Sequence, residues 1–269
     1  MANRFPARLH VLMASKAPAA VINRRGPSKT VCTIGWDRRK DKFTVGQWMR
    51  GRIYERRSDL SPDGKYMIYF AMNGRWHTAA KGSWTAISKA PYLKAVTLFP
   101  KGDCWNGGGL FTGRGRYWLN DGYGHAGMSD SHEVVRDEEF RPEGGIGGEC
   151  LGVYFPRLLR DGWKALGLHD QAHVFEKPFA RGWSLRKFAG YGGGEGKACY
   201  SDQHQLVHHR RDIVIPFATW EWAEVDGSRL VWADAGALYS GKASASGLCE
   251  AKSLADFNGL TFEPLAAPY

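Results

Sequence analysis

The sequence has few of the features that mark secreted, membrane-spanning or metal-binding proteins. Its five cysteines are an odd number and include no short CxxC pair, so neither a compact disulfide framework nor a cysteine-rich zinc site is indicated. No apolar run is long enough to span a membrane, and residues 9–14 are too few for a usual secretory segment. We therefore expect a cytoplasmic protein with reduced, buried thiols and no membrane partner.

Motifs for catalysis and nucleotide binding are missing as well. The sequence contains no GxSxG elbow and no kinase signature. The glycine-rich segment 190–198 fails as a phosphate loop, because Tyr191 stands at the first glycine position of GxxxxGK and Ala198 replaces the Ser or Thr that would hold Mg²⁺. His169 and His173 have the i, i+4 spacing of a metal-binding helix but lack the neighbouring glutamate of a metalloprotease. We predict no catalytic residue and no cofactor.

A denser histidine group follows later in the chain. On a strand, His204 and His208 would share one face, whereas His209 would point to the other. A metal would need a third ligand from another loop, such as His169 or Asp202. We interpret the group as histidines at the surface or at the edge of the core, and we predict no metal site.

Amphipathic windows of helix length are scarce, whereas strand-like runs are frequent. The best helical window, 155–168, contains Asp161-Gly162, and such a glycine costs a helix interior about 1 kcal/mol. The turn signal LSPDGK at 60–65 precedes an apolar run of strand length at 66–70. The other predicted strands are 9–13, 31–36, 84–88, 95–99, 152–155, 183–188, 205–208, 217–222 and 229–232. The pattern predicts an all-β protein.

The most informative feature that is present is a repeat. Four tryptophans are separated by 48, 99 and 49 residues: Trp36, Trp84, Trp183 and Trp232. Four cysteines keep a similar period at steps of 46, 49 and 50: Cys104, Cys150, Cys199 and Cys249. Periods of about 20–50 residues are typical of repeat proteins, because one unit cannot bury its apolar face alone. Five such units fill the chain.

The phrase LSPDGKYMIY at 60–69 resembles the blade signature of TolB-like and WD-type β-propellers, with a weaker echo at 226–232. The phrase GSWTAISKAP at 82–91 resembles uncharacterised bacterial propeller-type proteins, from which no activity carries over. The sequence departs from the WD pattern because no Gly-His…Trp-Asp pair recurs, and the period is nearer the roughly 50 residues of kelch repeats. The resemblance implies the propeller architecture more firmly than any single family.

We therefore predict a single β-propeller domain over residues 1–269, with five blades of about 49 residues, each a four-stranded sheet. The recurring tryptophans would fill the wedges between blades, each burying about 150–250 Å². Closure of the ring requires its ends to meet. We expect residues 8–14 to pair in one sheet with the C-terminal stretch 260–265.

Basic charge is concentrated in the first-blade region, 1–57. It holds 14 Lys and Arg against 3 Asp and Glu, whereas the remainder holds 23 against 24. Arginine predominates, and its planar guanidinium suits carboxylate and phosphate. We predict a binding face formed by Arg24, Arg25, Arg38, Arg39, Lys40, Arg50, Arg52, Arg56 and Arg57. Its alternative is a solvated face that only keeps the protein soluble.

The predicted function is non-catalytic: an interaction module that binds an acidic protein surface or nucleic acid. Aromatic residues within the basic region would stack on bases where they do not face the core: Trp36, Phe43, Trp48 and Tyr54. One alternative is a lectin-like glycan binder. A second is a glycoside hydrolase, which needs two carboxylates about 5–10 Å apart. Its loop candidates are Asp103, Glu149, Asp161, Glu195, Asp202 and Asp256.

Overall fold

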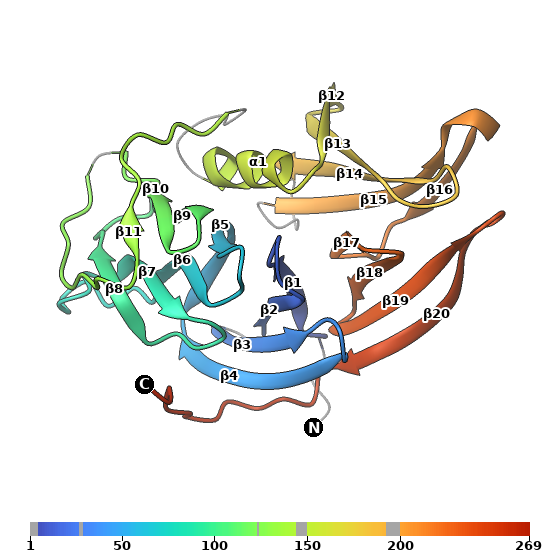
Figure 1. Ribbon diagram of the computed structural model, residues 1–269. Coiled ribbons are helices and arrows are strands. Elements are labelled where there is room, and N and C mark those ends of the chain that lie inside the picture. Colours follow the sequence, from blue (N-terminus) through green and yellow to red (C-terminus); the bar gives the residue numbers. More distant parts are fainter. Residues whose placement is uncertain (1–4, 27–28, 123, 144–149, 192–199) are drawn as a thin grey trace. The chain divides into compact units, whose positions relative to one another are not determined.

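The computed structural model describes residues 5–26, 29–122, 124–143, 150–191 and 200–269 (Figure 1). Strands account for 54% of the structure and helices for 6%, which confirms the predicted all-β class. Within the described residues, the strands form five sheets of three to five strands each. Most neighbouring strands are consecutive in the chain and antiparallel, as expected for sheets built from hairpins.

The chain divides into two compact units. Unit 1 comprises Met1–His10 and Gly162–Leu260, and unit 2 comprises Val11–Asp161 and Thr261–Tyr269. Each unit therefore contains one end of the chain together with a central segment.

Unit 2 contains three sheets. The first has the order β1-β2-β3-β4, and its strands are Arg8–Met13, Ala19–Arg25, Thr30–Asp37 and Lys42–Arg50, although Arg8–His10 of β1 belong to unit 1. The second has the order β5-β6-β7-β8, with strands Arg52–Leu60, Tyr66–Met72, Ser83–Lys89 and Ala95–Pro100. The third has the order β11-β10-β9, with strands Val135–Arg136, Arg116–Leu119 and Gly109–Gly113, and its β10–β11 pair is parallel.

Unit 1 contains two sheets. The larger consists of β12 to β16 in chain order, with strands Lys164–His169, Ala172–Pro178, Ser184–Tyr191, Tyr200–His208 and Ile213–Phe217. The other consists of β17 to β20, with strands Trp222–Asp226, Arg229–Asp234, Ala237–Ser244 and Gly247–Asp256. A single 3₁₀ turn, His209–Arg211 (η1), connects β15 to β16.

The turn signal at 60–65 joins β5 to β6 as predicted. The Ser61 N–H donates to the Tyr66 carbonyl at 2.8 Å, and the Ser61 hydroxyl donates to Asp63 Oδ1 at 2.7 Å. Gly64 has φ +75°, a conformation that glycine adopts without the penalty of a side chain. Local turn chemistry therefore sets this hairpin.

Strand β5 contains a bulge that the alternation of side chains does not predict. Its pairing with β6 shifts between Tyr54 and Asp59, so the intervening residues leave the regular register. Helix α1, Cys150–Arg160, packs against β5 and β9. The bulge and the helix together bury the polar side chains of residues 56–59.

Helix α1 is a partial correction of the sequence analysis. The predicted strand 152–155 is wrong, because these residues lie in α1. The window 155–168, against which Asp161-Gly162 counted, overlaps α1 in part: α1 ends at Arg160, before Asp161-Gly162, and β12 follows. No helix in the described part of the chain is long and apolar enough to cross a membrane.

The predicted closing pair is wrong. Residues 260–265 form no strand, and β1 is an edge strand whose neighbour is β2. The C-terminal segment is instead held in unit 2 largely by side chains, since Gln47 Nε2 donates to the Leu265 carbonyl at 2.8 Å and the Phe262 ring packs on Trp48 at 5.8 Å. Pro264 lacks an N–H and is unsuited to a sheet ladder.

The repeating tryptophans occupy similar places in the structure, whereas the repeating cysteines do not. Three of the four tryptophans, Trp36, Trp183 and Trp232, are buried, and the four lie in or directly before strands of four different sheets. The cysteines occupy unrelated places: Cys104 is exposed in a loop, Cys150 begins α1, Cys249 lies in β20, and Cys199 falls outside the described residues. The described cysteines are free thiols, but only Cys32 and Cys150 are buried as expected.

Candidate functional site

The nine residues predicted to form one basic face occupy three different environments. Arg24, Arg56 and Arg57 are buried, with 0%, 4% and 2% of their surface exposed. The guanidinium of Arg57 donates to the carbonyl oxygen of Cys104 at 2.7 Å and lies over the rings of Tyr54 and Phe70. These three arginines are part of the packing of unit 2 and offer no surface to a partner.

A second group, Arg38, Arg39 and Lys40, lies in the turn between β3 and β4. Arg38 is engaged by the chain itself, since its guanidinium donates to the carbonyls of Ala14 and Ala17 at 2.8 and 2.5 Å. Arg39 and Lys40 are exposed. Of the three cations in this turn, only Arg39 and Lys40 are exposed enough to contact a large partner.

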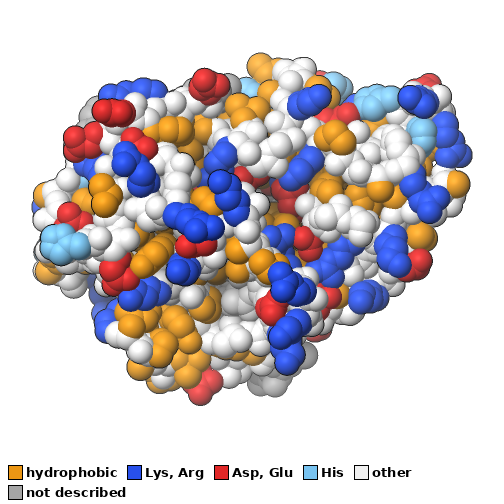
Figure 2. Space-filling view, viewed as in Figure 1, with side chains coloured by type: hydrophobic (Ala, Val, Ile, Leu, Met, Phe, Trp, Pro, Cys, Tyr) orange, Lys and Arg blue, Asp and Glu red, His pale blue; other side chains and the backbone are white. Residues whose placement is uncertain are grey.

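The third group, Arg25, Arg50 and Arg52, lies at the opposite end of the same strands. Arg25 pairs with Val31 at the start of β3, whereas Asp37 ends that strand. Six residues of strand separate the two ends by about 20 Å. In the view of Figure 2, Lys and Arg side chains are interspersed with acidic and hydrophobic ones on both units. The structure thus divides the predicted face.

The end of unit 2 that carries Arg50 and Arg52 also carries two exposed tryptophans. Trp76 is 48% exposed and Trp105 is 57% exposed. We call this surface the basic-aromatic rim and define it as Lys29, Arg50, Arg52, Arg75, Trp76, Lys81 and Trp105. All of these side chains are exposed except Arg52, which is half-buried over the Tyr54 ring at 4.6 Å.

Strand register brings the parts of the rim to one edge. Arg52 pairs with Met72, Met72 pairs with Ser83, and Trp84 pairs with Pro100. The first residues of β5 and β7 therefore lie beside the last residues of β6 and β8. Four adjacent strands spaced about 4.8 Å apart give this edge a width of about 15 Å.

Short contacts hold the loops of the rim in place. The Gly51 N–H donates to the Lys29 carbonyl at 2.7 Å, which joins the β4–β5 connection to the β2–β3 turn. A Cβ on Gly82 would lie 2.5 Å from the Trp76 ring, so the indole rests on this glycine, and 48% of Trp76 remains exposed. The Trp105 N–H donates to Asp103 Oδ1 at 2.9 Å. Both tryptophans are thus supported by their own loops.

The carboxylates near the rim are paired with cations outside it. Glu55 pairs with Arg25 at 3.3 Å, and Asp103 pairs with Lys101 at 3.0 Å. Asp121 pairs with Arg136. Because these acids are already matched, the cations of the rim leave a net positive field at this edge.

His125 lies in the loop after β10, close to this end of unit 2. Burial lowers its pKa to about 4, and the nearby Lys101 charge adds to the shift. Neither ring nitrogen has a hydrogen-bond partner among the described residues. His125 is therefore neutral at physiological pH and contributes no charge to the rim.

The aromatic residues proposed from sequence for base stacking are not open. Trp36 is buried and stacks on Phe43 at 5.9 Å, and Tyr54 packs on Phe70 at 5.3 Å. Trp48 packs on Phe262 of the C-terminal segment. Sequence reasoning missed Trp76 and Trp105, although Gly74 and the 107–109 glycine run marked their segments as loops.

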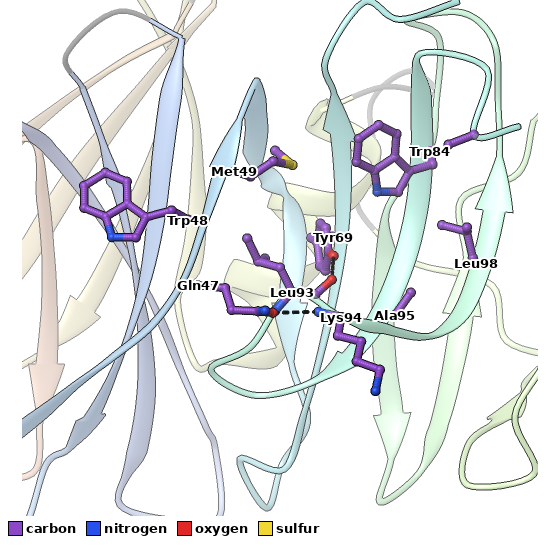
Figure 3. A pocket seen from close by; sticks show the side chains of 10 residues that line it. Gln47, Trp48, Met49, Tyr69, Trp84, Leu93, Lys94, Ala95 and Leu98 are labelled. Carbon is purple, nitrogen blue, oxygen red and sulfur yellow. Dashed lines mark hydrogen bonds between the residues drawn. The ribbon is translucent and has the colours of Figure 1, made fainter. Parts of the chain in front are cut away.

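Unit 2 also contains an open pocket of about 400 Å³, lined by β4, β6, β7, β8 and the segment before β8 (Figure 3). Trp48 and Trp84 lie on opposite sides of it. Its main polar group, Gln47, is engaged at both ends of its amide: Oε1 accepts from the Leu93 and Lys94 N–H groups at 2.7 and 2.9 Å, and Nε2 donates to Leu265. The pocket offers apolar surface but few free hydrogen-bonding groups.

The four described carboxylates among those considered for a glycoside hydrolase lie in different elements of the structure. Asp103 and Asp161 are each bound to a cation, Lys101 and Arg160 respectively. Asp202 lies in β15 and Asp256 ends β20, in different sheets of unit 1. Glu149 and Glu195 fall outside the described residues.

The predicted histidine arrangement is confirmed in part: His204 and His208 share one face of a strand, whereas His209 lies beyond β15 in η1. His204 and His208 are buried on one face of β15, and His209 is exposed. Burial lowers the pKa of His204 to about 3, and the Lys187 charge contributes. Among the described residues, no three His, Cys, Asp or Glu side chains are placed to hold a metal ion.

The segment 190–198, rejected above as a phosphate loop, lies mostly outside the described residues. No protein-family model matches the sequence, and no curated protein matches it either.

Proposed function

We propose that the basic-aromatic rim of unit 2 binds single-stranded nucleic acid. The observation that carries the proposal is the pair of exposed indoles, Trp76 and Trp105, among cations on one edge. Single-strand binders combine a positive surface that follows the backbone with aromatic rings on which bases stack.

The charge of the rim supports an anionic ligand. Arg50, Arg75 and Lys81 are exposed, whereas the nearby acids Glu55 and Asp103 are bound to other cations. The phosphates of a bound nucleic-acid strand would contact several positive side chains within the width of one β-sheet. Binding of this kind weakens steeply with salt, because neutralised phosphates release counterions.

The tryptophans favour nucleic acid over an acidic protein as the partner. Large exposed aromatic rings cost free energy in water unless a partner covers them, and unpaired bases offer flat faces that match an indole. Paired bases inside a duplex are stacked already and are not available to Trp76 or Trp105. We therefore expect single strands to bind more tightly than a duplex of the same length.

Fluorescence anisotropy of a labelled oligonucleotide, titrated at several salt concentrations, tests the proposal. The charge variant is Arg50→Ala/Arg75→Ala/Lys81→Ala, and its matched control is Arg39→Ala/Lys40→Ala at the other end of the strands. We expect the rim variant to lose affinity and to flatten the plot of log K against log [salt] by about 0.7 for each lost phosphate contact. The control should bind as the wild type does.

The stacking variant is Trp76→Ala/Trp105→Ala. Stacking of a base on an aromatic side chain contributes about 1–3 kcal/mol, so the double variant should bind single strands at least about tenfold more weakly. Absence of binding even at low salt would overturn the proposal. Equal losses in the rim and control variants would show that the charge acts without a defined site.

The lectin-like alternative rests on the pocket between Trp48 and Trp84. Glycan recognition needs hydrogen-bonding groups beside the aromatic surface, and the Gln47 amide already serves the chain. We therefore rank glycan binding in this pocket below nucleic-acid binding at the rim. A glycan array that gives signal with the wild type and none with Trp84→Ala would favour it over the rim.

We also propose that the five sheets are the blades of a five-bladed β-propeller, as the TolB-like and WD-type resemblance implies. Their number and the chain-order meander of four of them support the proposal. A compact domain of this length has a radius of gyration of about 18 Å. Small-angle X-ray scattering tests it, since two separated lobes would give a clearly larger value.

We propose a cytoplasmic location, where nucleic acid is accessible and thiols stay reduced. Cell fractionation with an antibody to the chain tests it, and recovery in an exported fraction would contradict it.

A further inference from the structure

The C-terminal segment 261–269 covers a tryptophan near the end of β4. The Phe262 ring lies 5.8 Å from the Trp48 ring, centre to centre, at an angle of 51°. The Arg50 guanidinium lies over the same phenyl ring, 5.0 Å from its centre. Phe262 therefore contacts both an indole and an arginine of β4, yet 40% of it remains exposed. In Figure 1 the segment runs beside β4.

Trp48 lies next to the basic-aromatic rim. It precedes Arg50 by two residues in β4, and side chains two residues apart in a strand take the same face. Arg50 belongs to the rim, so the surface of the rim continues to Trp48. The Arg24 guanidinium lies 5.3 Å from the centre of the Trp48 ring and places a buried positive charge beside it. An uncovered Trp48 would extend the rim by one stacking position.

The covering segment joins an aromatic ring to a negative charge. Glu263 directly follows Phe262, is exposed, and is the only charged residue of the segment. A nucleotide likewise joins a flat ring to an anion. Single-strand binders hold a base on an aromatic side chain and add cation–π contacts from arginine. Phe262 thus occupies a position that has the chemistry of a nucleotide site.

The attachment of the segment allows its first part to leave. The segment forms no strand, and most of its side chains are exposed. Two contacts beyond Phe262 hold its end: Gln47 Nε2 donates to the Leu265 carbonyl at 2.8 Å, and the Tyr269 hydroxyl accepts from the Lys89 N–H at 3.0 Å. Such a segment opens locally without the loss of a sheet ladder. Its anchored end keeps the phenyl ring close to the tryptophan, so the ring competes as part of the same molecule.

We propose that Trp48 and Arg50 form an additional nucleotide subsite, which Phe262 occupies until a single strand displaces it. This inference rests on the function proposed above. In the subsite a base stacks on Trp48, and its phosphate contacts Arg50. The base has an advantage over the phenyl ring, because Phe262 meets the indole at 51° whereas a base can lie parallel to it. The closed subsite lowers the apparent affinity of the rim by the fraction of chains that are closed.

Anisotropy titrations of a labelled single-stranded oligonucleotide with the full chain and with Phe262→Ala test the proposal. We expect Phe262→Ala to bind at least about threefold more tightly, because the subsite is then open in every molecule. An abasic strand of the same length should bind both proteins equally, since it has no base to stack. The matched control is Phe5→Ala, an exposed phenylalanine of unit 1, which should bind as the wild type does.

A second measurement follows the ring itself. With para-fluorophenylalanine in place of Phe262, fluorine NMR distinguishes a ring packed on Trp48 from a ring in solvent. We expect the resonance to move to the solvent position as the oligonucleotide is added, with the same midpoint as the anisotropy titration. The abasic strand should leave the resonance where it is.

The results separate this inference from the function on which it rests. Equal affinities of the wild type and Phe262→Ala, or an unmoved fluorine resonance while the oligonucleotide binds, would overturn the subsite and leave the rim as a binding surface. A gain in affinity that persists in Trp48→Ala/Phe262→Ala would show that the gain does not depend on the indole, and would also overturn the subsite. Absence of binding by both the wild type and Phe262→Ala would overturn both proposals.

Discussion

The two units bury cations in different ways. Among the described residues, most of the buried cationic side chains of unit 2 are arginines, including Arg56, Arg57 and Arg157, and the Lys101 side chain is also buried. Those of unit 1 are Lys187 and histidines such as His204. An arginine does not give up its proton inside a protein, whereas a histidine does so readily. The difference decides how each unit accommodates charge.

In unit 2 the charge of the buried arginines is kept and matched by geometry, whereas His125 is neutralised by burial. Burial lowers the pKa of Arg157, and its Nη1 donates to the carbonyls of Glu55, at 3.2 Å, and Ser58. Burial alone would also lower the pKa of Arg160, but the charge and hydrogen bonds of Asp59 outweigh it and leave that pKa raised. The core of unit 2 therefore depends on acceptors for the guanidinium groups of Arg157 and Arg160.

In unit 1 the histidine charge is removed, and the lysine charge is placed on an aromatic face, as several arginine charges of unit 2 also are. The pKa of His204 falls to about 3, so the ring is neutral, and its Nδ1 lies 3.2 Å from the Trp220 carbonyl. Lys187 Nζ lies 4.8 Å from the centre of the Trp163 ring, a cation–π contact. Unit 1 should therefore be less sensitive to the loss of one acceptor and more sensitive to acid.

The largest effect should come from Asp59→Asn in unit 2. Asp59 is 1% exposed, and it accepts two hydrogen bonds from Arg160, at 2.5 and 2.9 Å, and one from the Phe111 N–H at 2.7 Å. Hydrogen bonds to a charged group contribute about 1.5–3 kcal/mol each, and Arg160 is partly exposed and keeps its pair with Asp161, so we expect a clear fall in the urea midpoint of unfolding. The exposed pair partner Glu133→Gln is the control and should leave the midpoint nearly unchanged. Similar urea midpoints for Asp59→Asn and Glu133→Gln would contradict the conclusion that unit 2 depends on acceptors for its buried guanidinium groups.

The next effect concerns acid and unit 1. Because the pKa of His204 is depressed from 6.5 to about 3 in the folded state, its contribution to stability is complete above about pH 6.5 and is lost as the pH falls toward 3. The loss amounts to roughly 2 kcal/mol at pH 5. Urea unfolding followed from pH 7 to 4.5 should show a shallower decline in His204→Asn than in the wild type. If stability falls equally with pH in His204→Asn and in the wild type, the acid sensitivity of unit 1 does not come from His204.

The smallest effect should come from Glu224→Gln in unit 1. Glu224 accepts from Lys177 Nζ and from the Trp163 indole N–H, each at 2.9 Å. Glutamine retains one acceptor oxygen for the indole, and Lys177 can turn toward solvent because it is only partly buried. We expect a loss of about 1 kcal/mol, measured by the same urea unfolding. A loss as large as that of Asp59→Asn would erase the contrast between the units.

Local chemistry made much of the fold predictable. The LSPDGK turn, the strand that follows it and most other strands depend on residues within a few positions of one another. Strand 152–155 was mispredicted because a short apolar run suits a buried helix as well as a strand. Helix α1 forms there against β5 and β9, contacts that involve residues distant in the sequence.

The candidate site was less predictable than the fold. The excess of positive charge in residues 1–57 was visible, but the period of two in a strand says only which face a residue takes, not at which end of a sheet it lies or whether a bulge buries it. Arg57 is inaccessible because carbonyls of Cys104 and Asn106, almost fifty residues away, accept its N–H groups. Trp76 and Trp105 joined Arg50 and Arg52 only through strand register.

By itself, the sequence determined the all-β class, the positions of several turns, the burial of most repeating tryptophans and the basic excess of the first region, because each of these follows from composition or from neighbouring residues. Only the tertiary structure decided which arginines are buried, which end of a sheet each exposed one occupies, and which segment covers Trp48. The physical reason is that burial and hydrogen-bond satisfaction depend on groups that lie far apart in the chain and meet only when the strands pair.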